Sequence, residues 1–127
     1  MVAVRGATSL VEDSVAELDS AVPELVVAML ESNGLHADQV VSILFTGTPD
    51  ITAKFPAASL RGMGFTDTPL ICAQEMDVKG AHKLIVRVLL YVEIPGDLRE
   101  LKARMKHQYL RSAAALRPDI SSNKTGQ

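Results

Sequence analysis

The sequence has little of several features that define common protein classes. It contains one cysteine among 127 residues, no tryptophan, only three phenylalanines and two tyrosines, and a formal net charge of −2. A single cysteine excludes an intrachain disulfide, and so few aromatic residues leave no stacking platform for nucleic acid. No apolar run approaches the length of about 18 residues expected of a membrane span. These absences argue against a disulfide scaffold, a nucleic-acid-binding protein and a membrane protein.

The chain does have abundant aliphatic residues and an uneven charge. Hydrophobic residues make up 47% of the sequence, which suits a single domain, expected at residues 1–117, and the polar end of the chain predicts a flexible tail at 118–127. Residues 1–60 carry two Lys/Arg and eight Asp/Glu, whereas residues 61–127 carry eleven and seven. An anionic small molecule would be drawn to the second half. Because no secretion signal is visible, we expect a cytoplasmic protein.

Hydrophobic periodicity predicts an α+β fold with a mixed β-sheet and helices on one face. Alternating or β-branched runs predict strands at 2–8, 40–46, 70–75 and 83–94. A long helix should begin near Ser14 and close at Asn33-Gly34, with Pro23 kinking or dividing it. Shorter helical segments are expected at 36–39 and 57–61, and a basic helix from 98 to about 109.

Two apolar runs between residues 69 and 92 each carry one charged residue. Arg87 lies within LIVRVLLYV (84–92), which is typical of a strand covered on both faces, and Glu75 ends the apolar run before it. A guanidinium stays protonated in proteins, and an unpaired buried charge costs about 3–5 kcal/mol. Arg87 therefore needs a carboxylate partner such as Glu75, in a structural ion pair, or an anionic ligand. These residues alone leave the two interpretations evenly balanced.

The usual catalytic constellations are missing. The three histidines lack metal-ligand spacing, so we expect no metal, and Cys72 lacks the sequence surroundings of a thiol nucleophile. Arginine pairs with carboxylates through two parallel hydrogen bonds, and Glu75 could receive a neutral polar group of the same ligand. Catalysis in such a site would rest on positioning and electrostatic stabilisation. The arginines in structured, partly apolar contexts, which together indicate recognition of a small dianion, are Arg5, Arg61, Arg87 and Arg117.

Short motifs follow one another along nearly the whole chain. They are VRGAT (4–8), TPD (48–50), FPA (55–57), CAQEMDV (72–78), VRV (86–88), Tyr109-Leu110 and LRPDI (116–120). Together they resemble the AroH-type monofunctional chorismate mutases. The resemblance is specific because it rests on the order of all the motifs rather than on one of them.

The resemblance implies a chorismate-mutase-like homotrimer whose sheets form a pseudo α/β-barrel, with active sites between neighbouring subunits. It implies a cofactor-free Claisen rearrangement of chorismate to prephenate, in the biosynthesis of phenylalanine and tyrosine. Arg87 would face the ether oxygen that gains negative charge, and Arg5 would hold a carboxylate. Glu75 would accept a hydrogen bond from the ring hydroxyl, with Cys72 contacting the same region. The remaining substrate contacts implied by the resemblance are Phe55, Ala57, Arg61, Ile71, Tyr109, Leu116 and Arg117.

Strand parity supports a site shared between subunits. Cys72 and Glu75 are three residues apart and should point to opposite faces, which lets each serve a different active site. We therefore interpret Glu75 and Arg87 as two walls of an intersubunit pocket with room between them. Ile71 and Ala58 depart from the family pattern, in which Thr and Lys are common, so two secondary contacts are lost. Two alternatives stay open: a non-catalytic trimeric protein that binds a small dicarboxylate, and a pericyclic lyase acting on isochorismate.

Overall fold

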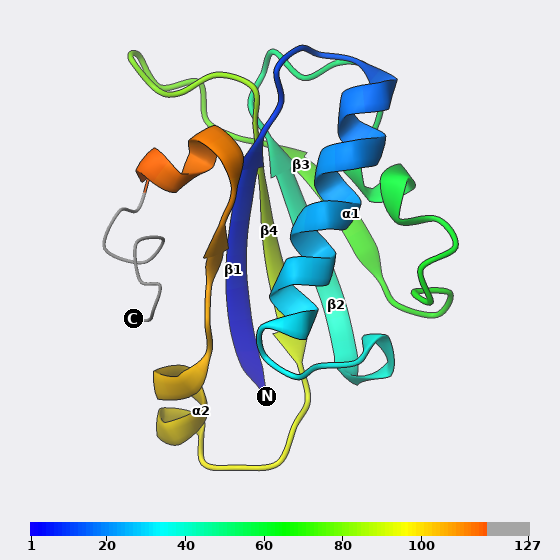
Figure 1. Cartoon of the computed structure of the whole chain (residues 1–127), viewed down its shortest axis with the longest axis vertical. Helices are drawn as coiled ribbons and strands as arrows, with labels where there is room; N and C mark the ends of the chain where they lie inside the picture. The colour runs from blue at the N-terminus through cyan, green and yellow to red at the C-terminus, as the bar shows by residue number, and fades with distance from the viewer. Residues whose placement is uncertain (117–127) are drawn as a thin grey trace.

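The computed structural model describes residues 1–116, which form one five-stranded sheet with helices packed against it (Figure 1). In chain order the elements are β1 (Val2–Ser9), α1 (Val15–Glu31), the 3₁₀ helix η1 (Ala37–Gln39), β2 (Val40–Gly47), the 3₁₀ helix η2 (Pro56–Leu60), β3 (Leu70–Gln74), β4 (Ile85–Val92), α2 (Leu98–Arg104), β5 (Gln108–Tyr109) and the 3₁₀ helix η3 (Arg111–Leu116). The tail predicted at 118–127 lies outside the described residues.

The sheet is mixed, and its strands follow the order β3-β2-β4-β1-β5. Strand β4 runs antiparallel to both β1 and β2, whereas β3 pairs in parallel with β2 and β5 in parallel with β1. The predicted α+β fold with a mixed sheet is confirmed. The four predicted strands correspond to β1, β2, β3 and β4, with differences of one or two residues at their ends.

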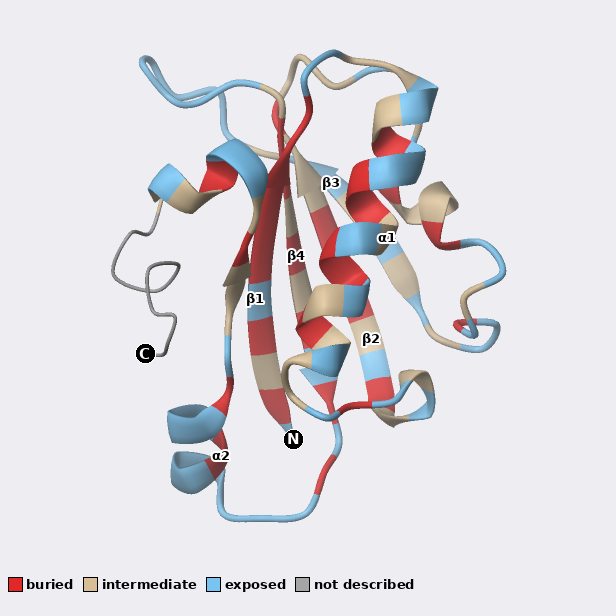
Figure 2. Ribbon diagram, viewed as in Figure 1, coloured by how far each residue is buried: buried red, intermediate tan, exposed pale blue. Residues whose placement is uncertain are grey.

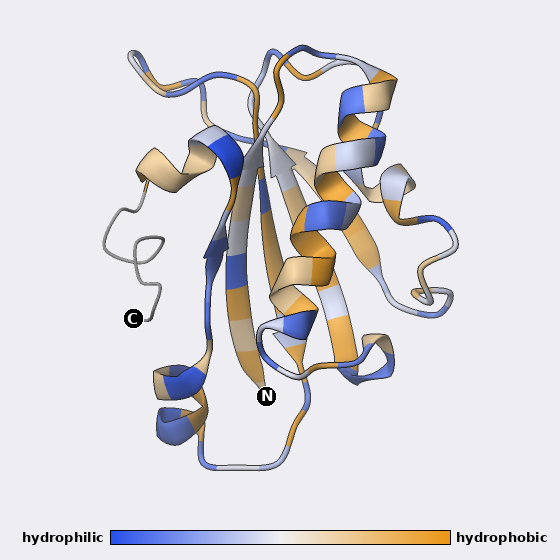
Figure 3. Ribbon diagram, viewed as in Figure 1, coloured by the Kyte–Doolittle hydropathy of each residue, from blue (hydrophilic) through white to orange (hydrophobic). Residues whose placement is uncertain are grey.

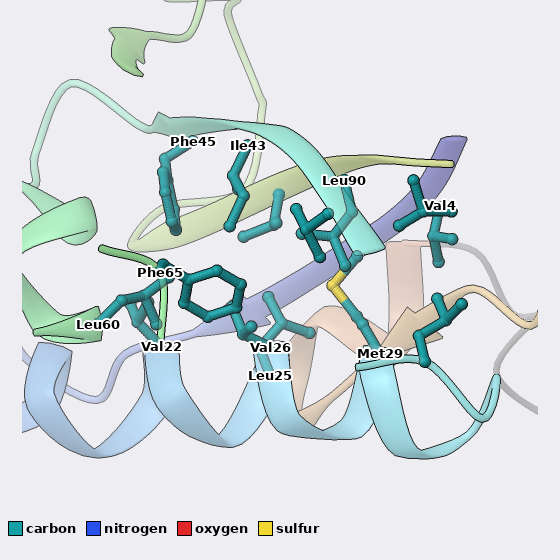
Figure 4. Packing of buried hydrophobic residues seen from close by; sticks show 14 of the residues in the cluster. Val4, Val22, Leu25, Val26, Met29, Ile43, Phe45, Leu60, Phe65 and Leu90 are labelled. Carbon is teal, nitrogen blue, oxygen red and sulfur yellow. The ribbon is translucent and has the colours of Figure 1, made fainter. Parts of the chain in front are cut away.

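Helix α1 covers one face of the sheet and forms the main core with it (Figures 1 and 4). Because apolar residues recur every three or four positions, the helix presents one continuous apolar stripe to the strands. Burying each large aliphatic side chain stabilises the fold by about 1.5–3 kcal/mol. The fully buried residues that meet here are Val22, Leu25, Val26 and Met29 of α1 and Val4, Ile43, Phe45 and Leu90 of the strands.

Pro23 does not divide α1, which runs without interruption from Val15 to Glu31. The proline removes one intrahelical hydrogen bond, at a cost of roughly 3 kcal/mol. Burial of Val22 and Val26 on either side of it offsets that cost, since both lie fully inside the core. At the start of the helix, the side chain of Ser14 accepts a hydrogen bond from the backbone N–H of Glu17 at 3.1 Å, as expected of an N-cap.

The prediction of a basic helix reaching Tyr109 is wrong. Helix α2 ends at Arg104, and Met105 already has extended backbone angles. The helical pattern of buried residues stops at Met105, and the chain then pairs with the free edge of β1, where Gly6 meets Gln108 and Ala7 meets Tyr109. Tertiary pairing with β1 thus outweighs the helix propensity of the segment.

The opposite face of the sheet is covered over only part of its area. Residues of η3 pack there against Ala7 and Ile85, near the β1 edge. Elsewhere Ile71 of β3 is 65% exposed and Tyr91 of β4 is 36% exposed. Figure 2 shows the buried interior between α1 and the strands, and Figure 3 shows that α2 is mostly hydrophilic. Within residues 1–116, none of the helices combines the length and hydrophobicity required to cross a bilayer.

Candidate active site

Arg87 lies in a row of residues that crosses the sheet on the face opposite α1. In the strand register Thr46 of β2 pairs with Arg87 of β4, Arg87 pairs with Ala7 of β1, and Ala7 pairs with Tyr109 of β5. Because side chains of paired residues leave the sheet on the same side, this row brings a hydroxyl, a guanidinium and a phenol onto one surface. Ala7, between Arg87 and Tyr109, is fully buried under Tyr109 and η3, so the open part of this surface lies nearer Arg5 and Thr46.

Glu75 follows β3 and reaches this surface beside Arg87. The Nε of Arg87 donates a hydrogen bond to Oε2 of Glu75 at 2.9 Å, and Oγ1 of Thr46 donates to the same oxygen at 2.7 Å. The structural ion pair considered from the sequence therefore exists. Glu75 and Arg87 are not two walls with room between them, because the surrounding strands bring the two side chains into direct contact.

The ion pair engages only one nitrogen of the Arg87 guanidinium and one oxygen of the Glu75 carboxylate. Within residues 1–116, neither terminal nitrogen of the Arg87 guanidinium has a hydrogen-bond partner, and Oε1 of Glu75 accepts no hydrogen bond. The Arg87 side chain is 43% exposed, and that of Glu75 is 17% exposed. Donors and an acceptor thus remain available to a ligand next to the pair.

Arg5 supplies a second cation to the same surface. It pairs with Leu89, which places it diagonally across from Arg87, a relation in which residues lie about 7–8 Å apart. Its side chain has no hydrogen bond or ion pair with the residues that the structure describes, whereas its backbone N–H donates to Nδ1 of His107 at 2.9 Å. Two guanidinium groups on one small surface repel each other, so an anion bound between them would be stabilised.

Arg5, Thr46 and Arg87 line an open cavity of about 210 Å³, next to the Glu75 carboxylate that Arg87 contacts. Tyr109 closes one side of it and is itself only 8% exposed, packed with Ala7, Ile85 and Ala113. Leu116 of η3 packs against the same cluster. The lining consists of Arg5, Gly6, Leu44, Thr46, Arg87, Val88, Leu89 and Tyr109.

The other predicted site residues lie elsewhere on the chain. Cys72 and Phe55 line a different cavity, of about 280 Å³, and Ala57 and Arg61 line a third, of about 640 Å³. Phe55 is 73% exposed. Cys72 packs against the core on the α1 side, while Glu75 lies on the Arg87 side, as strand parity predicts. One chain therefore carries two groups of predicted site residues that do not meet within it.

Two aspartates of the α1 region hold the segment that carries Phe55 and Arg61. Asp13 accepts hydrogen bonds from the backbone and side chain of Thr52 and from the N–H of Ala53, at 2.6–3.0 Å. The Thr52 side chain contributes most to lowering the pKa of Asp13 below its ordinary value. Asp19 likewise accepts from Lys54 and from Ser59, and the hydrogen bond from Lys54 is the main cause of its lowered pKa.

Ile71 and Arg117 complete the predicted set. Ile71 pairs with Leu44 and lies exposed on the Arg87 face of edge strand β3. Arg117 lies outside the described residues. Across residues 1–116, no group of three or more His, Cys, Asp or Glu side chains is arranged to hold a metal ion.

Sequence reasoning missed Thr46, which orients Glu75 and lines the cavity. The available signal is that Thr46 is the only polar side chain in the second half of β2, where it directly follows Ile43, Leu44 and Phe45. Its role depends on the register that places it opposite Arg87. That register cannot be read from either strand alone.

Comparison with known proteins identifies the family of the chain. The profile of the family described as chorismate mutase type I matches residues 1–120. The chain belongs to the type I chorismate mutases. A chorismate mutase AroH from Thermus thermophilus is 37% identical over 94% of this chain and 95% of the relative, and one from Bacillus subtilis is 36% identical over 95% and 93%. The resemblance drawn from the sequence motifs is confirmed.

A solved structure shares the type I chorismate mutase fold. It is a chorismate mutase from Clostridium thermocellum, which is 37% identical, with a TM-score of 0.83 over 91% of this chain and 99% of that one. The sheet and its helices are therefore those of a chorismate mutase, and the surface around Arg87 is its candidate active site.

Proposed function

We propose that the protein catalyses the Claisen rearrangement of chorismate to prephenate without a cofactor, in the biosynthesis of phenylalanine and tyrosine. The reaction breaks a carbon–oxygen bond and forms a carbon–carbon bond within one molecule, so it requires no second reactant. It needs no nucleophile and no proton transfer, only restriction of the substrate and stabilisation of the charge that develops. The single observation that carries the proposal is the pair of arginines, Arg5 and Arg87, on one cavity beside the Glu75 carboxylate.

Arg87 would act on the ether oxygen of the breaking bond. Negative charge grows on that oxygen in the transition state, and donors already fixed in place stabilise it without reorganisation. The ion pair with Glu75 holds Arg87 by its Nε only, so the two terminal nitrogens remain available to a ligand. The pair thus supports the proposed role, since a tethered guanidinium loses less freedom when substrate binds.

Glu75, Arg5 and Tyr109 would restrict the substrate around that point. Arg5 would bind a carboxylate, because its guanidinium has no partner within residues 1–116 and shares the cavity. The Oε1 of Glu75 would accept a hydrogen bond from the ring hydroxyl, and Tyr109 would donate to the pyruvyl side. A ligand held at three points is close to its reactive conformation before the bond breaks.

We further propose that the active site is completed between subunits of a homotrimer in the cytoplasm. The cavities lined by Cys72 and Phe55 and by Ala57 and Arg61 lie apart from the one lined by Arg87. Their residues would form the second wall of a neighbouring subunit's site, with Leu116 and Arg117 covering the ligand. The partly uncovered sheet face, with Ile71 and Tyr91 exposed, supports burial against other copies.

The experiment is a chorismate assay on the purified protein, followed as loss of the ring-diene absorbance with prephenate identified as the product. Turnover well above the spontaneous rate, with no added metal or cofactor, is expected. Arg87→Ala should lower kcat by several orders of magnitude, about the effect of losing the main electrostatic contact. Arg99→Ala, on exposed helix α2, is the matched control and should leave kcat unchanged. Binding of chorismate without turnover would instead favour a non-catalytic dicarboxylate-binding protein.

A further inference from the structure

The turn into η3 contains a side chain that the proposed mechanism does not use. Arg111 has a φ of +54°, in the left-handed region that residues with a Cβ rarely adopt. The turn separates Tyr109, which lines the active-site cavity, from η3, which carries Leu116. Strain of this kind persists only where surrounding contacts hold the residue in place.

Those contacts come from helix α1, on the far side of β1. The Nε of Arg111 donates a hydrogen bond to Oε1 of Glu24 at 3.0 Å, and its Nη2 donates to Oγ of Ser20 at 3.2 Å. Its Nη1 lies 3.6 Å from Oε1 of Glu17. The three acceptors are spaced i, i+3 and i+7, so they form one stripe on the helix surface. All three nitrogens of the guanidinium are thus engaged along two turns of α1.

The contacts between Arg111 and α1 form an anchor. Hydrogen bonds from the backbone N–H groups on either side of Arg111 connect this anchor to β1 and to the residues that line the active-site cavity. The N–H of Leu110 donates to the carbonyl oxygen of Ala7 at 2.9 Å, and the N–H of Ser112 donates to Oγ of Ser9 at 3.0 Å. Tyr109 and Ala113 then pack on Ala7 on the face opposite α1. Residues 108–116 therefore wrap around the β1 edge, held by Arg111 on one side of the sheet and by the Tyr109 cluster on the other.

We propose that Arg111 is a positioning residue, which holds the Tyr109 and Leu116 wall of the active site in place through the acidic stripe of α1. It does not line the cavity and touches none of the proposed catalytic groups. Exposed ion pairs are individually weak, but here one rigid, forked cation meets three acceptors at once. This inference rests on the proposed chorismate mutase activity.

Loss of the anchor should affect substrate binding more than the chemical step. With a looser wall, substrate must order residues 108–116 as it binds, and that cost is shared by the ground state and the transition state. Arg111→Ala should therefore raise KM about fivefold to tenfold with kcat changed less than about twofold. Arg111→Gly should raise KM less than Arg111→Ala, because glycine adopts a positive φ without strain. Arg111→Lys should restore part of the binding.

A double-mutant cycle with Glu24 tests the proposed route through α1. The Glu24 side chain has no hydrogen bond or ion pair within residues 1–116 other than that to Arg111, and alanine suits an exposed helix position. Glu24→Ala should raise KM in the native background and add nothing in the Arg111→Ala background, since the contact is already lost. Additive effects of the two substitutions would overturn the proposal. Arg99→Ala serves as the control.

Amide exchange gives a readout that does not depend on activity. In Arg111→Ala the amide hydrogens of Leu110 and Ser112 should exchange faster, while those of β4 remain unchanged. An unchanged KM together with a lower melting temperature would show a purely structural role and overturn the proposal. If the unaltered protein failed to turn over chorismate, the proposed function would fail, whereas the exchange measurement would still report on the anchor.

Discussion

The carboxylate of Asp50 holds the backbone of Leu84 at the entrance to β4. Its two oxygens accept the N–H of Leu84 at 3.2 and 3.1 Å, and Oδ1 also accepts the hydroxyl of Thr48 at 2.6 Å. Leu84 has a φ of +55°, which a leucine rarely adopts. The Oγ1 of Thr48 in turn accepts the N–H of Ile85 at 3.0 Å. These bonds fix where β4 begins, and thereby which residue of β4 lies opposite Thr46.

Replacing Asp50 should affect both stability and activity. Asp50→Ala removes charge-assisted hydrogen bonds from a strained turn, and we expect the free energy of unfolding to fall by about 1–3 kcal/mol. Because Arg87 lies three residues after Leu84, kcat should fall as well. Urea unfolding and chorismate turnover would measure the two effects. Asp67→Ala, at an exposed loop position, is the control, and equal effects from both variants would contradict the argument.

Thr46→Val tests whether orientation of Glu75 matters for catalysis. Valine keeps the shape of threonine but removes the donor that reaches Oε2 of Glu75. A hydrogen bond to a charged group contributes about 1.5–3 kcal/mol, so kcat/KM should fall about tenfold or more. Thr8→Val is the matched control, because Oγ1 of Thr8 is buried without a partner among the described residues. It should leave stability unchanged or raise it; a similar loss of activity in both variants would contradict a specific role for Thr46.

Gly6→Ala should destabilise the fold. A Cβ at this position would collide with Sδ of Met29 and lie 3.1 Å from Cδ1 of Leu25, inside the packed layer beneath α1. Overpacking of this kind costs about 1–3 kcal/mol. Gly47→Ala is the same change in β2, where the nearest atoms, of Ile51, are 3.6 Å or more away. Denaturant unfolding should show a clear loss for Gly6→Ala and a small effect for Gly47→Ala.

The hydrogen bonds by which Asp13 holds residues 52 and 53, next to Phe55, should weaken at low pH. The folded-state pKa of Asp13 is lowered, chiefly by its hydrogen bond from Thr52, so the carboxylate stabilises the fold above its unfolded-state pKa of about 3.8 and loses that contribution as the pH falls through the folded-state value. Asp13→Asn cannot respond in this way. The difference in stability between the protein and Asp13→Asn should stay constant above about pH 5 and shrink as the pH falls below about 3.8, as measured by denaturant unfolding. A difference that stayed constant at low pH as well would contradict the assignment.

Much of the fold could be predicted from the sequence because the spacing of apolar residues determines which segments form helices and which form strands. The stripe of α1 from Leu18 to Met29 and the β-branched runs of β2 and β4 each have one arrangement that buries them. The segment after Arg104 could not be predicted in this way. Its charges and propensity favour a helix, but its structure is decided by pairing with β1, 102 residues away in sequence.

The sequence predicted which residues form the candidate site, but not how their side chains contact one another. Arg5, Glu75 and Arg87 stand out because each places a charge in an apolar context. Their mutual contact depends on strand order and register, which local sequence does not specify. The direct bond between Glu75 and Arg87 shows the difference: both residues were identified, yet the space expected between them is absent.

The separation of Cys72 and Glu75 onto opposite faces of the sheet has a genetic consequence in the proposed trimer. A chain damaged at Arg87 and a chain damaged in the Phe55–Arg61 segment would each be inactive alone. If the two were expressed together, random assembly would pair an intact Arg87 surface with an intact neighbouring segment in about a quarter of the sites. Two null alleles would then complement each other, whereas two alleles damaged on the same face would not.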